Sequence, residues 1–88
     1  MLEFALGEAL RGQAHLLEAL GAYQAAVGTS AYDLDLHQRA LLAAGEVSDL
    51  LAKREDALTE YRAAIALDSS TEEAETARKH LNRPYHGH

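Results

Sequence analysis

Several residue types are scarce in this chain of 88 residues, and each shortage excludes some folds or functions. Cysteine is absent, which excludes disulfides and thiol chemistry. Proline occurs once, and the β-branched apolar residues amount to two valines and one isoleucine, whereas alanine and leucine are abundant. This balance favours helices over strands. The sequence therefore predicts one small all-α domain.

Basic side chains and long apolar runs are also in short supply. The chain has 8 Lys and Arg against 14 Asp and Glu, a formal net charge of −6, which opposes phosphate backbones and argues against a nucleic-acid partner. No apolar run approaches the roughly 20 residues of a membrane span, and the first residues do not resemble a signal peptide. We expect a cytoplasmic protein with no membrane partner, unless the chain is a fragment whose signal lies upstream.

What the chain does have is an internal repeat in which every matched pair of residues has the same separation. The first copy contains a glycine, an alanine–leucine pair, a tyrosine and another alanine: Gly7, Ala19, Leu20, Tyr23 and Ala26. The second copy has the same residue types 38 positions later: Gly45, Ala57, Leu58, Tyr61 and Ala64. A period of this size is typical of stacked helical repeats, which present binding surfaces more often than they catalyse reactions.

Apolar residues at spacings of three and four predict five helices. They cover residues 2–11, 14–27, 35–51, 55–67 and 71–82. Asp33 or Asp35 can cap the third helix, and Ser70 with Glu73 has the spacing of a capping box at the start of the fifth. Pro84 ends the fifth helix, and we expect residues 84–88 to form a flexible tail.

The second helix of each copy resembles that of the tetratricopeptide repeat. Its best match is Asp-Ala-Leu-Thr-Glu-Tyr-Arg-Ala-Ala-Ile-Ala-Leu-Asp at residues 56–68. The resemblance implies a right-handed α-α superhelix within a single domain over residues 1–83. Its parts are repeat one at about 2–31, repeat two at about 35–69 and a capping helix at about 71–82.

Two features depart from the pattern of that family. Its usual period is about 34 residues, so the copies here are separated by a short insertion of four extra positions. We place the insertion around residues 30–35, as a longer turn or an added helical turn. The proline that normally follows the second helix is replaced by Ala31 and Ser69.

Members of this family are adaptors that grip an extended peptide or a partner's helix, largely with the first helix of each hairpin. The resemblance therefore implies an inward surface made of Phe4, Glu8, Arg11, Arg39, Leu42, Glu46 and Asp49. It does not extend to the chaperone-binding subgroup, because Phe4, Glu8 and Ala43 lie where that subgroup has polar or basic residues. An acidic and partly apolar surface predicts a protein or peptide partner of basic or mixed apolar character.

Three other interpretations of the sequence compete with this one. His86 and His88 could hold a cation, but structural zinc needs about four ligands, so a solvated tail is favoured and no metal or cofactor is expected. Glu46 and Asp49 share a helix face, which we interpret as solvated or peptide-binding rather than catalytic, so we predict no enzyme. Residues 2–11 carry Leu2, Phe4, Leu6 and Leu10 with few charges. This helix could bind a second copy of the chain or upstream repeats of a longer protein.

Overall fold

The computed structural model describes residues 2–87, and this part of the chain consists of five helices, their connections and a segment after the last helix. The helices are α1 (Leu2–Gly12), α2 (Leu16–Thr29), α3 (Leu34–Leu50), α4 (Arg54–Leu67) and α5 (Glu72–Asn82). Each begins and ends within two residues of its predicted bounds, so the predicted all-α class is confirmed. Met1, the first residue of the predicted domain, lies outside the described residues.

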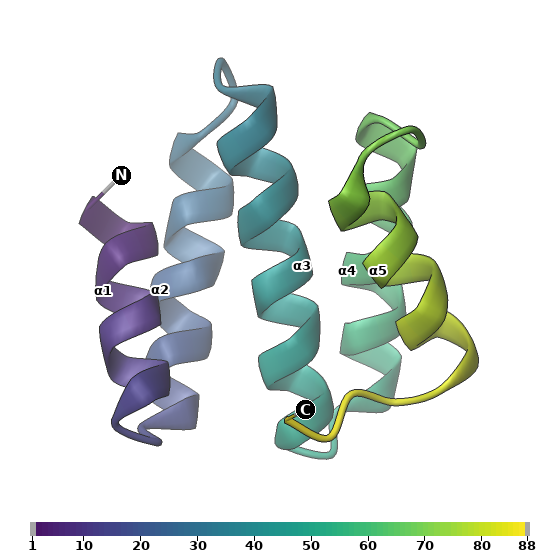
Figure 1. Ribbon diagram of the computed structural model, residues 1–88. Coiled ribbons are helices and arrows are strands. Elements are labelled where there is room, and N and C mark those ends of the chain that lie inside the picture. The colour runs from purple at the N-terminus through teal and green to yellow at the C-terminus, as the bar shows by residue number, and fades with distance from the viewer. Residues whose placement is uncertain (1, 88) are drawn as a thin grey trace.

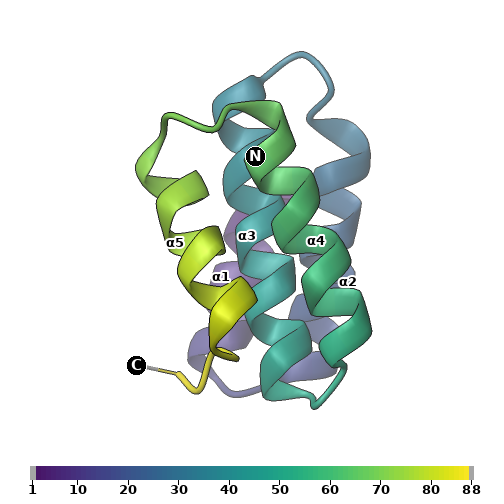
Figure 2. The same cartoon turned by 90° about the vertical axis from the view of Figure 1, so that its right-hand side faces the viewer.

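The five helices form two layers (Figure 1). One layer contains α1, α3 and α5, and the other contains α2 and α4, as the perpendicular view also shows (Figure 2). Consecutive helices pack against each other, and α3 also contacts α5. The central helix α3 therefore joins the two hairpins, α1–α2 and α3–α4, to the last helix. Of the helices described, none is both long and apolar enough to cross a membrane.

The repeat offset, which is the separation of Gly7 from Gly45, also relates the bounds of the helices. Adding this offset to the first and last residue numbers of α2 gives the first and last residues of α4. Adding it to the last residue number of α1 gives the last residue of α3. The connection between α2 and α3 has the same length as the connection between α4 and α5, whereas α3 has 17 residues and α2 and α4 have 14 each. The inserted residues therefore lengthen helix α3 and not the turn before it, which is one of the two alternatives that the sequence left open.

Both hairpin turns have the same backbone conformation. Ala14 and Ala52 occupy the left-handed region, with φ of 63° and 61°. In each hairpin the amide of the following residue donates back to the carbonyl five positions earlier, over 2.8 Å. This is the Schellman arrangement, which satisfies carbonyl groups at the end of a helix and usually has glycine in the left-handed position.

The core of each hairpin is built on the contact between a glycine and a tyrosine. Tyr23 and Tyr61 are fully buried. A Cβ atom built on Gly7 would lie 2.7 Å from Tyr23 Cδ1, and one on Gly45 would lie 2.5 Å from Tyr61 Cε1. Only glycine lets the ring lie flat against the neighbouring helix at this distance, so the repeated glycines have a packing function.

The first turns of α3 hold the start of α5. Gln38 is buried, and its Nε2 donates to the carbonyl oxygens of Ala64 and Asp68, both over 2.8 Å. Its Oε1 accepts a hydrogen bond of 2.8 Å from the Thr71 hydroxyl. One side chain thereby satisfies groups on α4, on the turn after it and at the cap of α5.

Asp33 is the N-cap of α3, accepting the amide three residues ahead over 3.0 Å. The cap of α5 is Thr71, which accepts the Ala74 amide over 3.0 Å, so the predicted capping box from Ser70 is wrong by one residue. Ser70 instead donates its hydroxyl to Asp68 Oδ1 over 2.6 Å. The hydroxyl and amide of Ser70 lower the pKa of the Asp68 carboxyl. The nearby carboxylate thus competes successfully for the serine hydroxyl.

Candidate functional site

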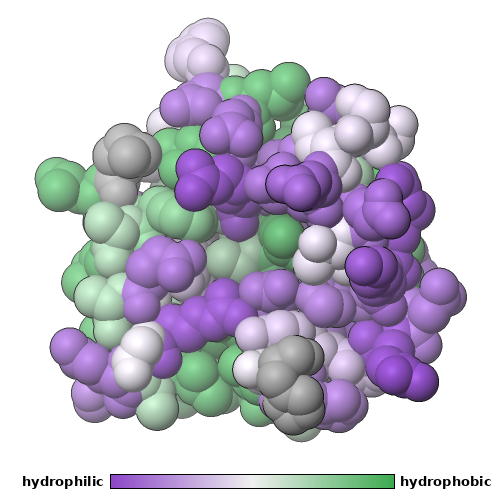
Figure 3. All heavy atoms as spheres, in the orientation of Figure 1, coloured by the Kyte–Doolittle hydropathy of each residue, from purple (hydrophilic) through white to green (hydrophobic). Residues whose placement is uncertain are grey.

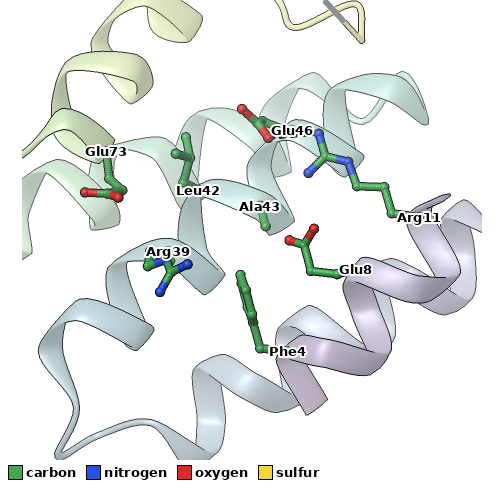
Figure 4. Close-up of a pocket in the computed structure, with 8 residues that line it drawn as sticks. All are labelled: Phe4, Glu8, Arg11, Arg39, Leu42, Ala43, Glu46 and Glu73. Atoms are coloured by element: carbon green, nitrogen blue, oxygen red, sulfur yellow. Dashed lines mark hydrogen bonds and ion pairs between the residues drawn. The ribbon is translucent and has the colours of Figure 1, made fainter. Parts of the chain in front are cut away.

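A groove lies on the face formed by α1, α3 and α5, and it brings together six of the seven predicted binding residues (Figure 4). Its volume is ≈ 420 Å³. The groove is lined by Phe4, Glu8 and Arg11 from α1, by Arg39, Leu42, Ala43 and Glu46 from α3, and by Glu73 from α5. Residues from both copies of the repeat therefore converge on one surface, because α1 and α3 belong to the same layer.

The apolar part of the groove is made of equivalent residues. Phe4 and Leu42 are separated by the repeat offset, and both are partly buried. The Phe4 ring packs on Tyr23, with ring centroids 5.6 Å apart, and the Arg39 guanidinium carbon lies 5.6 Å from the Phe4 centroid. Phe4 is therefore fixed from both sides, and its remaining surface faces the groove.

The charged part of the groove has three carboxylates and two guanidinium groups. Arg11 and Glu46 form an ion pair of 2.9 Å whose side chains are 20% and 14% exposed, so these two charges compensate each other. Glu8 accepts a hydrogen bond of 3.0 Å from the Tyr23 hydroxyl, and Glu73 lies on the opposite wall. Glu8 and Glu73 consequently give the groove its negative character, opposed by Arg39 alone.

Burial and pairing perturb the pKa values of Arg11, which lines the groove, and of Tyr23, which packs behind Phe4. Burial by itself lowers the pKa of the Arg11 guanidinium, but the hydrogen bond and charge of Glu46, with smaller contributions from Tyr23 and Tyr85, raise it overall. Burial, followed by the hydrogen bond to Glu8, raises the pKa of Tyr23 to about 12 even though Arg11 opposes the shift. Arg11 therefore stays charged and Tyr23 stays neutral at physiological pH.

The seventh predicted residue, Asp49, lies outside the groove. Its side chain is 1% exposed. Its two oxygens accept from Arg54 Nη1 over 3.0 and 2.9 Å, and Oδ2 also accepts from the Tyr61 hydroxyl over 2.7 Å. Burial, the hydrogen bond to Asp49 and its charge raise the pKa of Tyr61. Asp49 is thus a structural acceptor that links α3 to α4.

The solvated alternative for Glu46 and Asp49 is therefore wrong, whereas the peptide-binding alternative stays a prediction for Glu46, which lines the groove. Glu46 Oε1 accepts a hydrogen bond of 2.9 Å from Arg11 Nη2. Glu46 Oε2 lies 3.0 Å from His80 Nε2, within hydrogen-bond distance. Both carboxylates are enclosed because α5 and the residues after it cover this end of α3. Sequence spacing places two carboxylates on one side of a helix but does not reveal what packs over them.

The tail predicted to be flexible is in contact with the helices. Tyr85 is half-buried, and its amide donates to Asp49 Oδ2 over 3.0 Å. His86 and Gly87 are exposed, and His88, the other half of the histidine pair considered above, lies outside the described residues. Between residues 2 and 87, no three histidines, aspartates or glutamates are grouped so that they could hold a metal ion.

Glu73 is the groove residue that the sequence pattern did not reveal. The fifth helix is interpreted from its sequence only as a cap, because its apolar stripe is short. Yet α5 follows the second hairpin as a further first helix would, so its inward positions belong to the same face as those of α1 and α3. That order of helices was the available signal.

Comparison with known proteins adds no name to this arrangement. No protein-family model matches the chain, and neither a curated protein nor a solved structure matches it significantly. The functional conclusion therefore rests on the groove itself.

Proposed function

We propose that this chain is a protein-interaction module, without catalytic activity, that binds a segment of a partner protein in the groove between α1, α3 and α5. The observation that carries the proposal is the convergence of Phe4, Leu42 and the charged residues around them, from both copies of the repeat, on one open groove. The duplicated glycine–tyrosine packing supports the related proposal that the two hairpins are tetratricopeptide-type repeats. A cytoplasmic location stays a prediction from the sequence.

The chemistry of the groove defines the expected partner. An apolar side chain can pack over Phe4 and Leu42, which offer partly buried apolar surface. A basic side chain on either side of it would lie close to Glu8 or Glu73, the two groove carboxylates outside the Arg11 ion pair. We therefore propose a peptide or helix that carries an apolar residue flanked by lysine or arginine. Charge complementarity of this kind contributes mainly to specificity and association rate.

A library of random peptides selected against the intact chain tests this proposal. We expect the selected peptides to share an apolar residue with basic neighbours. Reversing the charge at Glu8 and Glu73 together (Glu8→Lys, Glu73→Lys) should weaken their binding about tenfold or more, measured by titration calorimetry. Glu46→Lys with Asp49→Lys is not a suitable test, because both carboxylates are buried in ion pairs and their reversal would disturb the fold.

Glu72→Lys provides the matched control for Glu73→Lys. Both residues belong to the first turn of α5, so both substitutions carry the same penalty from the helix dipole, but only Glu73 lines the groove. Selected peptides that bind the double variant as tightly as the original chain would contradict the proposal, as would equal effects of the substitutions at positions 72 and 73.

A second candidate function is self-association through the outer face of α1. Ala43, Ala44 and Val47 are buried in one cluster with residues of α2. The equivalent residues of α1, which are Ala5, Leu6 and Ala9, are exposed. Hydrophobic atoms gather at this edge of the molecule, whereas the edge formed by α5 is polar (Figure 3). The exposed face of α1 thus has the composition of a face that a helix covers elsewhere in the same chain.

We propose a second copy of the chain as the occupant of this face. The edge formed by α5 is polar and does not match the apolar face of α1, so a closed pair of α1 faces is favoured over head-to-tail extension (Figure 3). Sedimentation velocity over a range of concentrations should show a dimer that Leu6→Glu abolishes. Leu34→Glu is the matched control, because Leu34 is 53% exposed and Leu6 is 55% exposed. A monomer at all concentrations would contradict self-association and leave an upstream helix as the occupant.

A further inference from the structure

The segment that follows α5 returns across the face formed by α1, α3 and α5 (Figure 1). A single residue fixes it there. The Tyr85 amide donates to Asp49 Oδ2, and the Tyr85 hydroxyl accepts from Arg11 Nη2, both over 3.0 Å. The Tyr85 ring lies 5.3 Å from the Arg11 guanidinium carbon and meets the His80 ring edge-on, with centroids 5.1 Å apart. Backbone and side chain of this one residue are thus bound by three helices.

The walls of this tyrosine slot, formed by Arg11, Asp49 and His80, are held in place by bonds that do not involve Tyr85. Arg11 is bonded to Glu46, and Glu46 is bonded to His80. Asp49 keeps its bonds to Arg54 and Tyr61, and Arg54 also donates to the carbonyl oxygens of His80 and Leu81. When Tyr85 leaves, these groups retain hydrogen-bond partners, and the slot stays formed. A preformed site of this kind avoids the cost of ordering its side chains on binding.

Release of the tail also breaks few contacts. Pro84, His86 and Gly87 are exposed, and only Tyr85 is half-buried. A segment with one buried anchor opens locally far more readily than a core helix. The occupancy of the slot by Tyr85 is therefore exchangeable.

The tyrosine slot is continuous with the groove. Arg11 and Glu46 line the groove, and Arg11 also contacts both the ring and the hydroxyl of Tyr85. Figure 4 shows these two side chains together at one end of the groove. A partner segment that lies along the groove toward Arg11 reaches the position that Tyr85 occupies.

We propose that the tyrosine slot is an aromatic-recognition subsite of the groove, filled in the free chain by Tyr85 as an intramolecular ligand. A partner segment that presents a tyrosine takes the slot by displacing the tail. Its amide binds Asp49 and its phenol accepts from Arg11, as those of Tyr85 do. This inference rests on the proposed function, because it assumes that a partner segment lies in the groove, but the slot itself can be tested without that partner.

The test uses the full chain with Tyr85→Ala and a synthetic peptide of residues 82–88, followed by 1H–15N NMR. We expect the peptide to bind this variant and to shift the signals of Arg11, Asp49 and His80. The original chain should bind it at least about tenfold more weakly, because a tethered tail competes at an effective concentration in the millimolar range. A chain with His86→Ala, which changes an exposed neighbour of Tyr85, should behave like the original chain.

The matching peptide with alanine in place of tyrosine should not bind. Equal binding of the tyrosine peptide to the original chain and to the Tyr85→Ala chain, or shifts elsewhere on the surface, would overturn the proposal. If Tyr85→Ala does not fold, hydrogen exchange of the Tyr85 amide in the original chain decides. An exchange rate of the Tyr85 amide that does not change at low urea concentrations indicates local opening and supports a displaceable tail. Exchange that occurs only through global unfolding would reject a displaceable tail.

The proposal for the tyrosine slot and the proposal for the groove can be contradicted separately. A groove peptide from the library whose binding leaves Tyr85 amide exchange unchanged would reject displacement of the tail while the proposed function stands. Failure of the library selection together with binding of the tail peptide to the Tyr85→Ala chain would reject the groove proposal and retain the slot as a tyrosine-binding site.

Discussion

The two hairpins share one backbone plan but differ in the polar residues that hold them. Helix ends, left-handed alanines and glycine–tyrosine contacts all recur at the repeat offset. In contrast, Tyr23 donates to Glu8, which is exposed, whereas Tyr61 donates to Asp49, which is buried. The position equivalent to Asp49 in the first hairpin is Arg11, which faces the groove. Small and aromatic residues thus define the repeat, and the charged residues give each copy a separate role.

The largest expected effect comes from exchanging the equivalent positions 49 and 11 for alanine. Asp49→Ala leaves Arg54, Tyr61 and the Tyr85 amide without their acceptor, and should lower the free energy of unfolding by about 3 kcal/mol. Arg11→Ala should cost about 1–2 kcal/mol, because Glu46 keeps its bond to His80. Urea unfolding followed by circular dichroism measures both values.

Asp35→Ala is the control for these two substitutions. Its ion pair with Arg39 is exposed, so the change should cost less than about 0.5 kcal/mol. Equal losses for Asp49→Ala and Arg11→Ala would show that the two hairpins do not differ in the way described above.

The glycine–tyrosine contacts offer a second comparison. Gly7→Ala and Gly45→Ala should each destabilise the chain by about 1–2 kcal/mol, since the cost of overpacking exceeds the gain in helix propensity. The loss should be larger at Gly45, where the added carbon is closer to the ring and Tyr61 is tied to a buried carboxylate. Gly21→Ala, which meets no atom within 4 Å, should instead stabilise the chain by about 1 kcal/mol. Stabilisation by all three substitutions would refute the packing function.

The hairpin turns are expected to respond alike. Ala14→Gly and Ala52→Gly should each raise the free energy of unfolding by about 0.5–1 kcal/mol, because glycine adopts positive φ without the strain that alanine carries. Ala25→Gly, in the interior of α2, should lower it by about 1 kcal/mol. A marked difference between the two turns would mean that the rest of the hairpins affects them unequally.

The smallest effect concerns a polar pair present in one hairpin only. Glu60 accepts from the Ser48 hydroxyl over 2.9 Å, whereas the equivalent residues Ala22 and Leu10 are apolar. Burial raises the pKa of Glu60 above 4.5, although Ser48 opposes the shift. The folded chain thus holds this proton more tightly than the unfolded chain does. The contribution of Glu60 to stability therefore falls as pH rises from 4.5 through the folded pKa.

Glu60→Gln removes this dependence. The variant should be more stable than the original chain at neutral pH by less than about 1 kcal/mol, and the difference should vanish below pH 4.5. Thermal unfolding at several pH values measures it. A difference that is constant with pH would contradict the assignment to Glu60.

The sequence was sufficient for features that depend on local pattern. Helix bounds follow from apolar spacing, and the inward positions of α1 and α3 were expected from the resemblance to the tetratricopeptide repeat. The roles of Asp49, Gln38 and Tyr85 could not be predicted in the same way, because each depends on hydrogen bonds to residues more than ten positions away. For Asp49 a signal existed: a carboxylate replaces an arginine between two otherwise similar copies.

Both ends of α5 are fastened to the rest of the molecule. Gln38 and Thr71 tie its start to α3, and Arg54 ties its last carbonyl groups to α4. A helix restrained at both ends cannot swing about the turn that precedes it. The distance between Glu73 and the α1 wall is therefore set before any ligand arrives, and a partner that binds as proposed would be selected by its dimensions and not by closure of the groove around it.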